Sequence, residues 1–122
     1  MIEYNLIDSS IWIDYLINGN HKELIEKEDK LLLATISIIE IKKKFSKLKI
    51  PKKEINEKVD YIKKHSIIIN LDIKIADKAT ELVIEKNLAI ADSIIYASAL
   101  LNNALLITLD NDFRGLENVK IY

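Results

Sequence analysis

The sequence contains no cysteine, and it has only two glycines and one proline among its 122 residues. Without cysteine, the chain can form no disulfide, no zinc–thiolate site and no thiol nucleophile. The two glycines, Gly19 and Gly115, are far apart, whereas loops that cradle nucleotide phosphates need several glycines together. We therefore expect no nucleotide cofactor, and the lack of cysteine fits a reducing compartment.

Long hydrophobic runs are also missing, although 49% of the residues are hydrophobic. No run approaches the roughly 20 apolar residues of a membrane-spanning helix. Near the N-terminus, Glu3 and Asp8 stand where a secretory signal would carry basic residues and a longer apolar core. The sequence therefore predicts a cytoplasmic protein without a membrane segment, folded as a single domain over residues 1–122.

Charge is nearly balanced, with a net charge of −1 at pH 7, so bulk positive charge cannot drive binding to nucleic acid. One stretch departs from this balance. The segment KKKFSKLKIPKK, from Lys42 to Lys53, carries seven lysines and no acid. Each of these lysines taken alone is typical of a solvated helix face. As a block, they could attract a polyanion.

Short apolar runs alternate with longer segments of helical periodicity. Five runs are expected strands, at residues 3–7, 31–35, 66–70, 104–108 and 119–122, and such continuous runs suit strands buried on both faces. Between them, apolar residues recur every three or four positions, for example at Ile38, Ile41, Phe45 and Leu48. This alternation predicts a three-layer α/β/α fold around a mainly parallel sheet of four to five strands.

Two later helices are expected to have distinct packing. Asp72 is a candidate N-cap for one of them. The next, from Asp92 to Leu101, is apolar nearly all round and should be buried against the sheet. The buried side of the helix that follows Asp72 is expected to carry Ile75, Ala76, Ala79, Leu82 and Val83.

Acidic residues gather at one expected edge of the sheet. Asp8 ends the first strand, Glu40 lies in the expected first turn after the second, and Asp92 opens the buried helix. Asp110 and Asp112 follow the fourth strand. Ligands of open parallel sheets bind at this edge, beyond the carboxyl ends of the strands. So many carboxylates would repel one another without a cation, and oxygen donors alone favour Mg²⁺ or Mn²⁺ over zinc.

Each acid also has a structural explanation when it is considered alone. Asp8, Asp92 and Asp110 could cap helices or complement helix dipoles. Ser37 and Glu40 have the spacing of a capping box, in which the glutamate bonds back to the serine N–H. Capping could explain the position of any one of these acids, but it explains less well why all of them occur at the same edge of the sheet.

The segments that carry these acids are LIDSSIW, TISIIEI, AIADSIIYASAL and LLITLDNDF. In order and spacing they resemble PIN-domain ribonucleases, specifically the single-domain VapC type of toxin, over nearly the whole chain. The resemblance implies an α/β/α fold and a Mg²⁺- or Mn²⁺-dependent endoribonuclease that leaves 5′-phosphate and 3′-hydroxyl ends. It also implies a small antitoxin partner and usually a homodimer.

The resemblance further implies which residues form the site. Its catalytic acids fall on Asp8, Glu40, Asp92 and Asp110, and we expect Asp8, Asp92 and Asp110 to bind the metal. Auxiliary positions fall on Asp112, Ser10 and Thr108. With RNA as the substrate, candidate RNA contacts in the basic segment are Lys42, Lys43, Lys44 and Lys47. We expect His21 and His65 at the surface, and Trp12 and Tyr15 in helix packing.

The expected chemistry is hydrolysis of a phosphodiester by a water molecule that a divalent cation activates for in-line attack. Two other classes of function stay open. A phosphoacceptor receiver domain of two-component signalling has similar length and layering, but Asp8 is followed by Ser9 where a second acid would be expected. That function would also leave Glu40 and Asp92 without a role. The third alternative is a non-catalytic binding module of PIN-like fold.

Overall fold

A computed structural model of the chain describes residue 2, residues 4–27 and residues 31–122. The five strands are β1 (Tyr4–Ile7), β2 (Leu31–Ala34), β3 (Ile67–Ile69), β4 (Ala104–Thr108) and β5 (Val119–Ile121). They form one sheet in the order β3-β2-β1-β4-β5, and every neighbouring pair is parallel. The predicted α/β fold with a four- to five-stranded sheet is confirmed. Glu3, the expected start of the first strand, lies outside the described residues.

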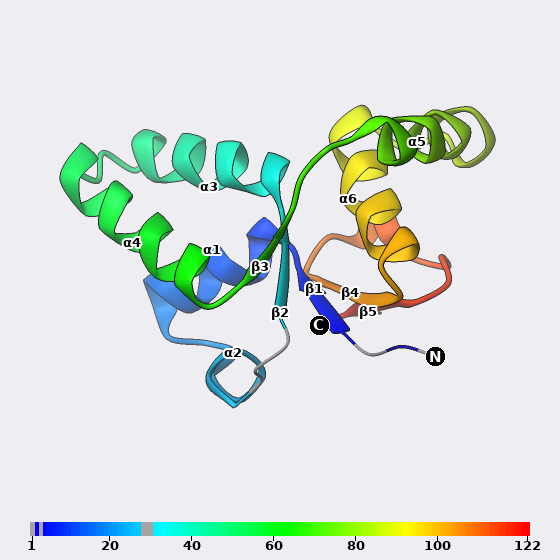
Figure 1. The fold of residues 1–122 in the computed structure, drawn as a ribbon. Helices are drawn as coiled ribbons and strands as arrows, with labels where there is room; N and C mark the ends of the chain where they lie inside the picture. Colours follow the sequence, from blue (N-terminus) through cyan, green and yellow to red (C-terminus); the bar gives the residue numbers. More distant parts are fainter. Residues whose placement is uncertain (1, 3, 28–30) are drawn as a thin grey trace.

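Helices cover both faces of the sheet (Figure 1). The connections contain α1 (Ser9–Asn18), α2 (Lys22–Glu26), α3 (Thr35–Lys47), α4 (Lys52–Lys64), α5 (Ile73–Lys86) and α6 (Ile90–Leu101). A short 3₁₀ helix, η1 (Asn111–Phe113), follows β4. Asp72 caps α5 as predicted, because its side chain accepts a hydrogen bond from the N–H of Ile75 at 2.9 Å. None of the helices in the described ranges is long and apolar enough to cross a membrane.

The core is divided by the sheet into two layers. Leu6 and Leu106 belong to the layer under α5 and α6, whereas their neighbours Ile7 and Ile107 belong to the layer that contains Trp12 and residues of α3 and α4. Successive residues of a strand point to opposite faces, so apolar residues at consecutive positions fill both layers. The prediction that apolar runs form strands buried on both faces is therefore confirmed for β1, β2 and β4.

The same prediction is wrong for β3. Ile67 is 52% exposed and Ile68 is 36% exposed, because β3 is an edge strand that pairs only with β2. Two helical positions also differ from the expectation. Leu48 follows the last turn of α3 and is 48% exposed, and Ala76 is exposed beside the buried stripe of α5 that contains Ile75.

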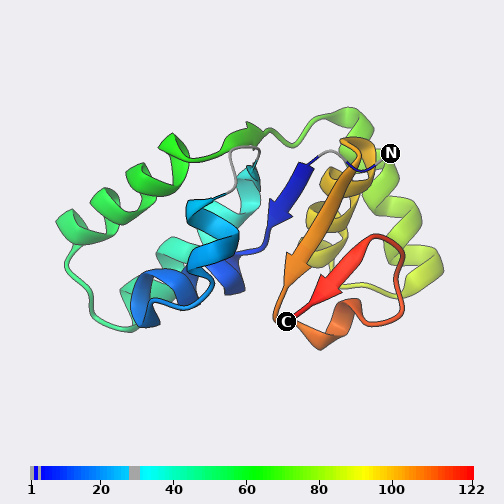
Figure 2. The same ribbon diagram turned by 90° about the horizontal axis from the view of Figure 1, so that it is seen from below.

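The strand order places β1 at the centre of the sheet, between β2 and β4. From β1 the chain moves to β2 and β3 on one side, and it then returns to add β4 and β5 on the other. In open α/β sheets, ligands bind at such a reversal, outside the carboxyl ends of the strands. Figure 2 shows β1 and β4 between the two helix layers. Receiver domains have the order 2-1-3-4-5, so the receiver alternative is wrong.

Candidate functional site

Asp8 lies at the reversal between β1 and β4. It follows the last residue of β1 and is the N-cap of α1, with only 5% of its surface exposed. One carboxylate oxygen accepts from the N–H of Ser9 at 2.8 Å. The other accepts from the hydroxyls of Thr108 at 2.7 Å and Ser10 at 3.2 Å. Burial raises the pKa of Asp8, and these three hydrogen bonds oppose that rise by favouring the charged form.

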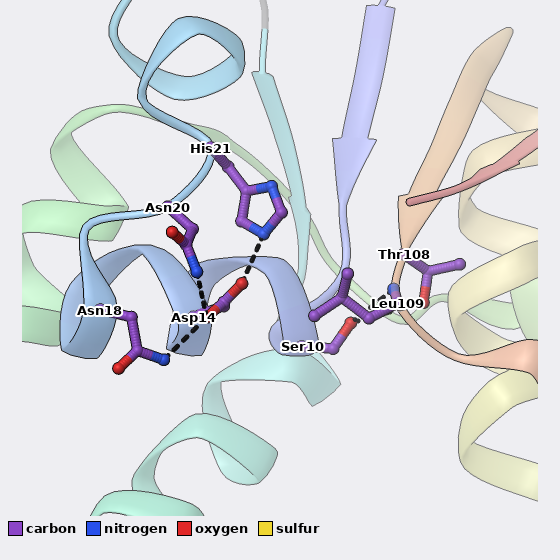
Figure 3. A network of polar contacts seen from close by, with 7 residues as sticks. All are labelled: Ser10, Asp14, Asn18, Asn20, His21, Thr108 and Leu109. Carbon is purple, nitrogen blue, oxygen red and sulfur yellow. Dashed lines mark hydrogen bonds and ion pairs between the residues drawn. The ribbon is translucent and has the colours of Figure 1, made fainter.

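Thr108 and Ser10 link the start of α1 to the end of β4. The Thr108 hydroxyl is fully buried and also accepts from the N–H of Asp110 at 3.0 Å. The Ser10 hydroxyl accepts from the N–H of Leu109 at 3.1 Å, as Figure 3 shows. These contacts hold the backbone before Asp110 close to Asp8. The structure thus gives Ser10 and Thr108 the positions beside the acids that the sequence analysis expected.

Glu40 reaches the same region from α3. One of its carboxylate oxygens accepts from the hydroxyl of Ser9 at 3.2 Å. Burial raises the pKa of Glu40, as does the charge of Asp8, and the charges of Asp92 and Asp110 add to the effect. Ser9 therefore links the two acids, because its N–H donates to Asp8 and its hydroxyl donates to Glu40. Ser9 was missed by the sequence analysis, although it directly follows Asp8.

The expected local position of Glu40 is wrong. Helix α3 starts at Thr35, immediately after β2, so Glu40 belongs to its second turn and not its first. The capping box is also wrong, because the N-cap is Ala34 and Ser37 lies inside the helix. The Ser37 hydroxyl is buried and makes no hydrogen bond within the described ranges. Glu40 is therefore free of a capping role.

Asp92 lies in the first turn of α6, which starts at Ile90 and has no side-chain cap. Asp92 does not open the helix as expected and is not its N-cap, but it is a first-turn acid that complements the helix dipole, as the structural alternative predicted. Its pKa is raised to about 6, first by burial and then by the charges of Asp110, Asp8 and Asp112. Three neighbouring carboxylates thus add to the effect of burial, which marks Asp92 as part of a site that concentrates negative charge.

Asp110 and Asp112 complete the cluster after β4. Asp110 is the N-cap of η1, and its side chain accepts from the N–H of Asp112 at 2.9 Å. Carboxylate oxygens of Asp92, Asp110 and Asp112 all lie within 4.8 Å of one another. Asp112, expected only as an auxiliary residue, is part of this group. Capping explains part of the placement of Asp8 and Asp110, but it accounts for neither Asp92 nor Glu40.

The composition of the cluster fits a hard divalent cation. All five side chains supply oxygen, and no histidine or cysteine belongs to the three-carboxylate group. In the described part of the chain, no lysine, arginine or histidine forms an ion pair with any of the five acids. Their mutual repulsion therefore has no protein counter-charge in direct contact. Asp92, Asp110 and Asp112 could hold the ion, and Asp8 and Glu40 would add to the field around it.

The basic segment begins just beyond Glu40. All seven of its lysines are exposed, and none forms an ion pair with a described residue. Lys43, Lys44 and Lys47 follow Glu40 by three, four and seven residues, so they share its side of α3. Lys42 projects from another side of the helix. The segment continues along the α3–α4 hairpin, which extends away from the sheet in Figure 1.

The two histidines lie outside the acid cluster, as expected, but His21 is not a surface residue. Its side chain is 11% exposed, and Nε2 lies 2.7 Å from Asp14. Asp14 also accepts from the side chains of Asn18 and Asn20 (Figure 3), and these two bonds are the main reason that its pKa is lowered. This network closes the turn between α1 and α2. His65 is exposed, as predicted.

The aromatic residues of α1 pack as expected. Trp12 is fully buried. Tyr15 is partly buried and donates a hydrogen bond to Glu26 at 2.7 Å, and its ring stacks on Tyr61 of α4 with centroids 6.3 Å apart. Both residues therefore hold α1 to its neighbours, as expected of helix packing.

Together, the fold and the site define an α/β/α protein with a candidate cation site at the reversal point of a parallel sheet. The sequence profile of the PIN domain matches residues 6–118. The chain therefore belongs to the PIN domain family. A direct comparison with curated proteins finds no match.

Several solved structures share the fold. A chain of a toxin–antitoxin complex from Klebsiella pneumoniae has 26% identity and a TM-score of 0.80, with 95% of each chain covered. VapBC2 from Rickettsia felis, bound to a DNA fragment of its promoter, has 22% identity and a TM-score of 0.77, with coverage of 98% of this chain and 99% of that one. VapC20 of Mycobacterium tuberculosis, a toxin that cleaves the sarcin–ricin loop, has 10% identity, a TM-score of 0.71 and coverage of 92% and 94%.

Proposed function

We propose that this chain is a Mg²⁺- or Mn²⁺-dependent endoribonuclease and the toxin of a type II toxin–antitoxin pair. The observation that carries the proposal is the cluster of Asp92, Asp110 and Asp112, whose oxygens lie within 4.8 Å of one another. Asp8 and Glu40 lie close enough to enter the same electrostatic network. Membership of the PIN domain family supports nuclease chemistry at this cluster.

The acids have separate roles in this proposal. Asp92 and Asp110, with Asp112 at the exposed rim, supply oxygens to the cation. Asp8 adds charge from the buried side, where Thr108 and Ser10 fix its orientation. The sequence analysis expected Asp8 to bind the metal together with Asp92 and Asp110. In the structure, both carboxylate oxygens of Asp8 already accept hydrogen bonds. When bound, the cation would stabilise negative charge on the scissile phosphate and ease deprotonation of the attacking water.

Glu40 is the candidate to orient the attacking water and accept its proton. One of its oxygens is held by Ser9, which fixes the direction of the carboxyl group. Its raised pKa, caused mainly by burial, makes it a better proton acceptor than an ordinary glutamate. Lys43, Lys44 and Lys47 on the same side of α3 would hold phosphates of the RNA beside the acids, with Lys42 at the margin.

The relatives support the proposed partners. The structures from Klebsiella pneumoniae and Rickettsia felis are toxin–antitoxin assemblies, which supports a small antitoxin as the partner of this chain. The similarity to a toxin that cleaves the sarcin–ricin loop supports RNA as the substrate class. We also propose that the protein acts in the cytoplasm and forms a homodimer.

The test is RNA cleavage by the purified chain, free of antitoxin. Labelled single-stranded and structured RNAs would be incubated with EDTA, Mg²⁺ or Mn²⁺, and the product ends would be mapped for 5′-phosphate and 3′-hydroxyl groups. We expect cleavage only with a divalent cation. Asp8→Asn, Glu40→Gln, Asp92→Asn and Asp110→Asn should each lower the rate by at least a hundredfold.

The matched control is Asp60→Asn, which removes an equally charged but exposed carboxylate from α4. Its cleavage rate should equal that of the wild type. Cleavage that persists in EDTA would contradict the metal-dependent mechanism. Folded wild-type protein that binds RNA but cleaves none of the substrates with either ion would favour the non-catalytic binding module.

A further inference from the structure

One pair of residues in the turn after α1 has a reactive sequence. Asn18 is the last residue of α1 and is followed by Gly19, and no other asparagine of the chain precedes a glycine. The backbone nitrogen of a glycine can reach the carboxamide of a preceding asparagine, because glycine has no side chain to restrict the main chain. Both residues are exposed to water. The sequence therefore allows Asn18 to lose its amide group as ammonia and to become an acid.

The folded chain holds the two reacting groups of this pair apart. The Asn18 side chain donates a hydrogen bond from Nδ2 to Oδ1 of Asp14 at 2.8 Å, one turn earlier in α1. Its carboxamide is thus held toward the N-terminus of the helix, away from the residue that follows. The N–H of Gly19 donates to the carbonyl oxygen of Tyr15 at 2.9 Å. The attacking group is the deprotonated amide, and this hydrogen bond favours the protonated form.

Asp14 holds the whole turn and not only Asn18. Its Oδ1 also accepts from Nδ2 of Asn20 at 3.0 Å, and its Oδ2 lies 2.7 Å from Nε2 of His21 (Figure 3). We call Asp14, Asn18, Asn20 and His21 the Asp14 network. Hydrogen bonds from the two asparagines are the main cause that lowers the pKa of Asp14, so its carboxylate stays charged and available to all three side chains. His21 also packs edge-on against the ring of Tyr122, with ring centroids 5.6 Å apart.

We propose that Asn18 is a deamidation site that the Asp14 network blocks and that local opening of the α1–α2 turn releases. In the open turn, hydroxide removes the proton of the Gly19 N–H, and the nitrogen attacks Cγ of Asn18. The new C–N bond closes a five-membered succinimide ring. The bond from Cγ to Nδ2 then breaks, and the amide leaves as ammonia with a proton from water, which restores the hydroxide. Water opens the ring at either carbonyl, so the net reaction consumes one water, releases one ammonia and leaves aspartate or isoaspartate.

The product cannot re-form the same turn. An aspartate at position 18 places a carboxylate where Nδ2 of Asn18 donates to Asp14, so two like charges face each other. The new charge also lies at the C-terminal end of α1, where the helix dipole favours a cation. Isoaspartate adds a methylene group to the main chain and displaces the N–H of Gly19 from Tyr15. An opening that leads to reaction is therefore irreversible and leaves the turn weaker. This inference does not depend on the cleavage chemistry.

The test follows the peptide that contains Asn18 by mass spectrometry while the full chain is incubated at pH 8. We expect the wild-type chain unfolded in urea to deamidate at Asn18 at least tenfold faster than the folded wild type, because opening limits the reaction in the folded state. Folded Asp14→Ala should approach the rate of the unfolded chain, since Asn18 has then lost its acceptor. His21→Gln removes only a neighbour of Asn18 in the network, and its rate should lie between those of the wild type and Asp14→Ala.

Two controls separate this mechanism from a general loss of structure. Asp60→Ala removes an exposed carboxylate from α4, and its rate at Asn18 should equal that of the wild type. The variants should keep the wild-type circular dichroism spectrum, and Asn118 should react no faster in them; if Asp14→Ala lost its fold, His21→Gln would decide. Equal rates in the folded and unfolded wild type would overturn the protection. An unfolded chain that stays intact at Asn18 would overturn the site, and folded variants that react no faster than the wild type would overturn the role of the Asp14 network.

The weakening of the turn has its own measurement. Asn18→Asp and Asn18→Ser change the same exposed position, but only the first adds a carboxylate beside Asp14. Asn18→Asp should melt below Asn18→Ser at pH 7.5, and the gap should narrow as the pH falls to about 3, where an aspartate is largely protonated. A gap that is absent, or that does not change with pH, would overturn the repulsion between the product and Asp14.

Discussion

Replacing Asp92 with asparagine tests the crowding of negative charge in the candidate site. The substitution keeps the shape of the side chain and removes a carboxyl group whose pKa is raised to about 6 by burial and by Asp110, Asp8 and Asp112. In the unfolded chain the same group titrates near 3.8. A raised pKa in the folded state gives stability that is present below the unfolded pKa and lost as pH rises through the folded one. Above pH 6, ionised Asp92 therefore destabilises the metal-free protein.

The expected size follows from the shift of about two pKa units, which corresponds to about 3 kcal/mol at most. Asp92 is only partly buried, so solvent screening reduces this figure, and we expect about 1 kcal/mol. For a domain of this length, that is a change in Tm of about 4 °C. Metal-free Asp92→Asn should thus melt about 4 °C above the wild type at pH 7.5, and the difference should disappear as the pH approaches 3.5.

With a divalent cation present, the wild type should melt at a higher temperature than Asp92→Asn. A ligand that binds only the folded state stabilises it by about 2.7 kcal/mol at a hundred times its Kd. The wild type should gain this stability from Mn²⁺, whereas Asp92→Asn should gain much less because it lacks one of the ligand carboxylates. The cleavage rate of the variant should fall by at least a hundredfold under the same conditions.

The measurement is a set of melting curves between pH 3.5 and 8, in EDTA and in Mn²⁺, with RNA cleavage measured in parallel. Asp60→Asn, on the exposed surface of α4, is the control, and its melting temperature and cleavage rate should match those of the wild type. The reasoning fails if metal-free Asp92→Asn melts below the wild type at pH 7.5. It also fails if Mn²⁺ stabilises the variant and the wild type equally.

Three further predictions concern residues around Asp92. Metal-free Asp110→Asn should melt at or above the wild type, because asparagine caps η1 about as well as aspartate and the change relieves repulsion with Asp92. The variant should nevertheless lose cleavage, and Asp112→Asn should have a milder effect. Cleavage by Asp110→Asn at the wild-type rate would make Asp110 only a cap. A triple variant with Lys43→Gln, Lys44→Gln and Lys47→Gln should bind RNA more weakly, and its affinity should depend less on salt in a filter-binding titration. The control variant with Lys63→Gln and Lys64→Gln should show neither change. An unchanged salt dependence in the triple variant would contradict the phosphate contacts. Thr108→Val should lower stability to urea by about 1–3 kcal/mol at pH 7, since it removes the 2.7 Å bond to buried Asp8. Thr108→Ser should retain most of that stability, and equal losses in both variants would point to packing as the cause.

The sequence was sufficient to predict the features that depend on periodicity. Continuous apolar runs located all five strands, and the acids that follow β1 and β4 located the edge where the cluster lies. The spacing of residues in α5 also predicted its cap at Asp72. These features are local, because they depend on which residues alternate and on what ends each run.

The predictions were wrong where the tertiary arrangement, and not the local sequence, determines the position or exposure of a residue. Helix α3 starts at Thr35 directly after β2 without a turn signal, so the position of Glu40 was misjudged by one turn. The exposure of Ile67 follows from the edge position of β3, and strand order cannot be read from periodicity. The Ser9–Glu40 bond joins residues 31 apart, and its geometry depends on how α3 packs on α1.

The hydrogen bond between Thr108 and Asp8 joins residues 100 positions apart, and it sets the point in synthesis at which the site can exist. A ribosome-bound chain that ends at residue 103 already carries Asp8, Glu40 and Asp92. It lacks β4, which pairs with β1 in the centre of the sheet, and it lacks both acids that follow β4. Contacts so distant in sequence form late. The complete cluster of acids can therefore form only when the last strands have left the ribosome.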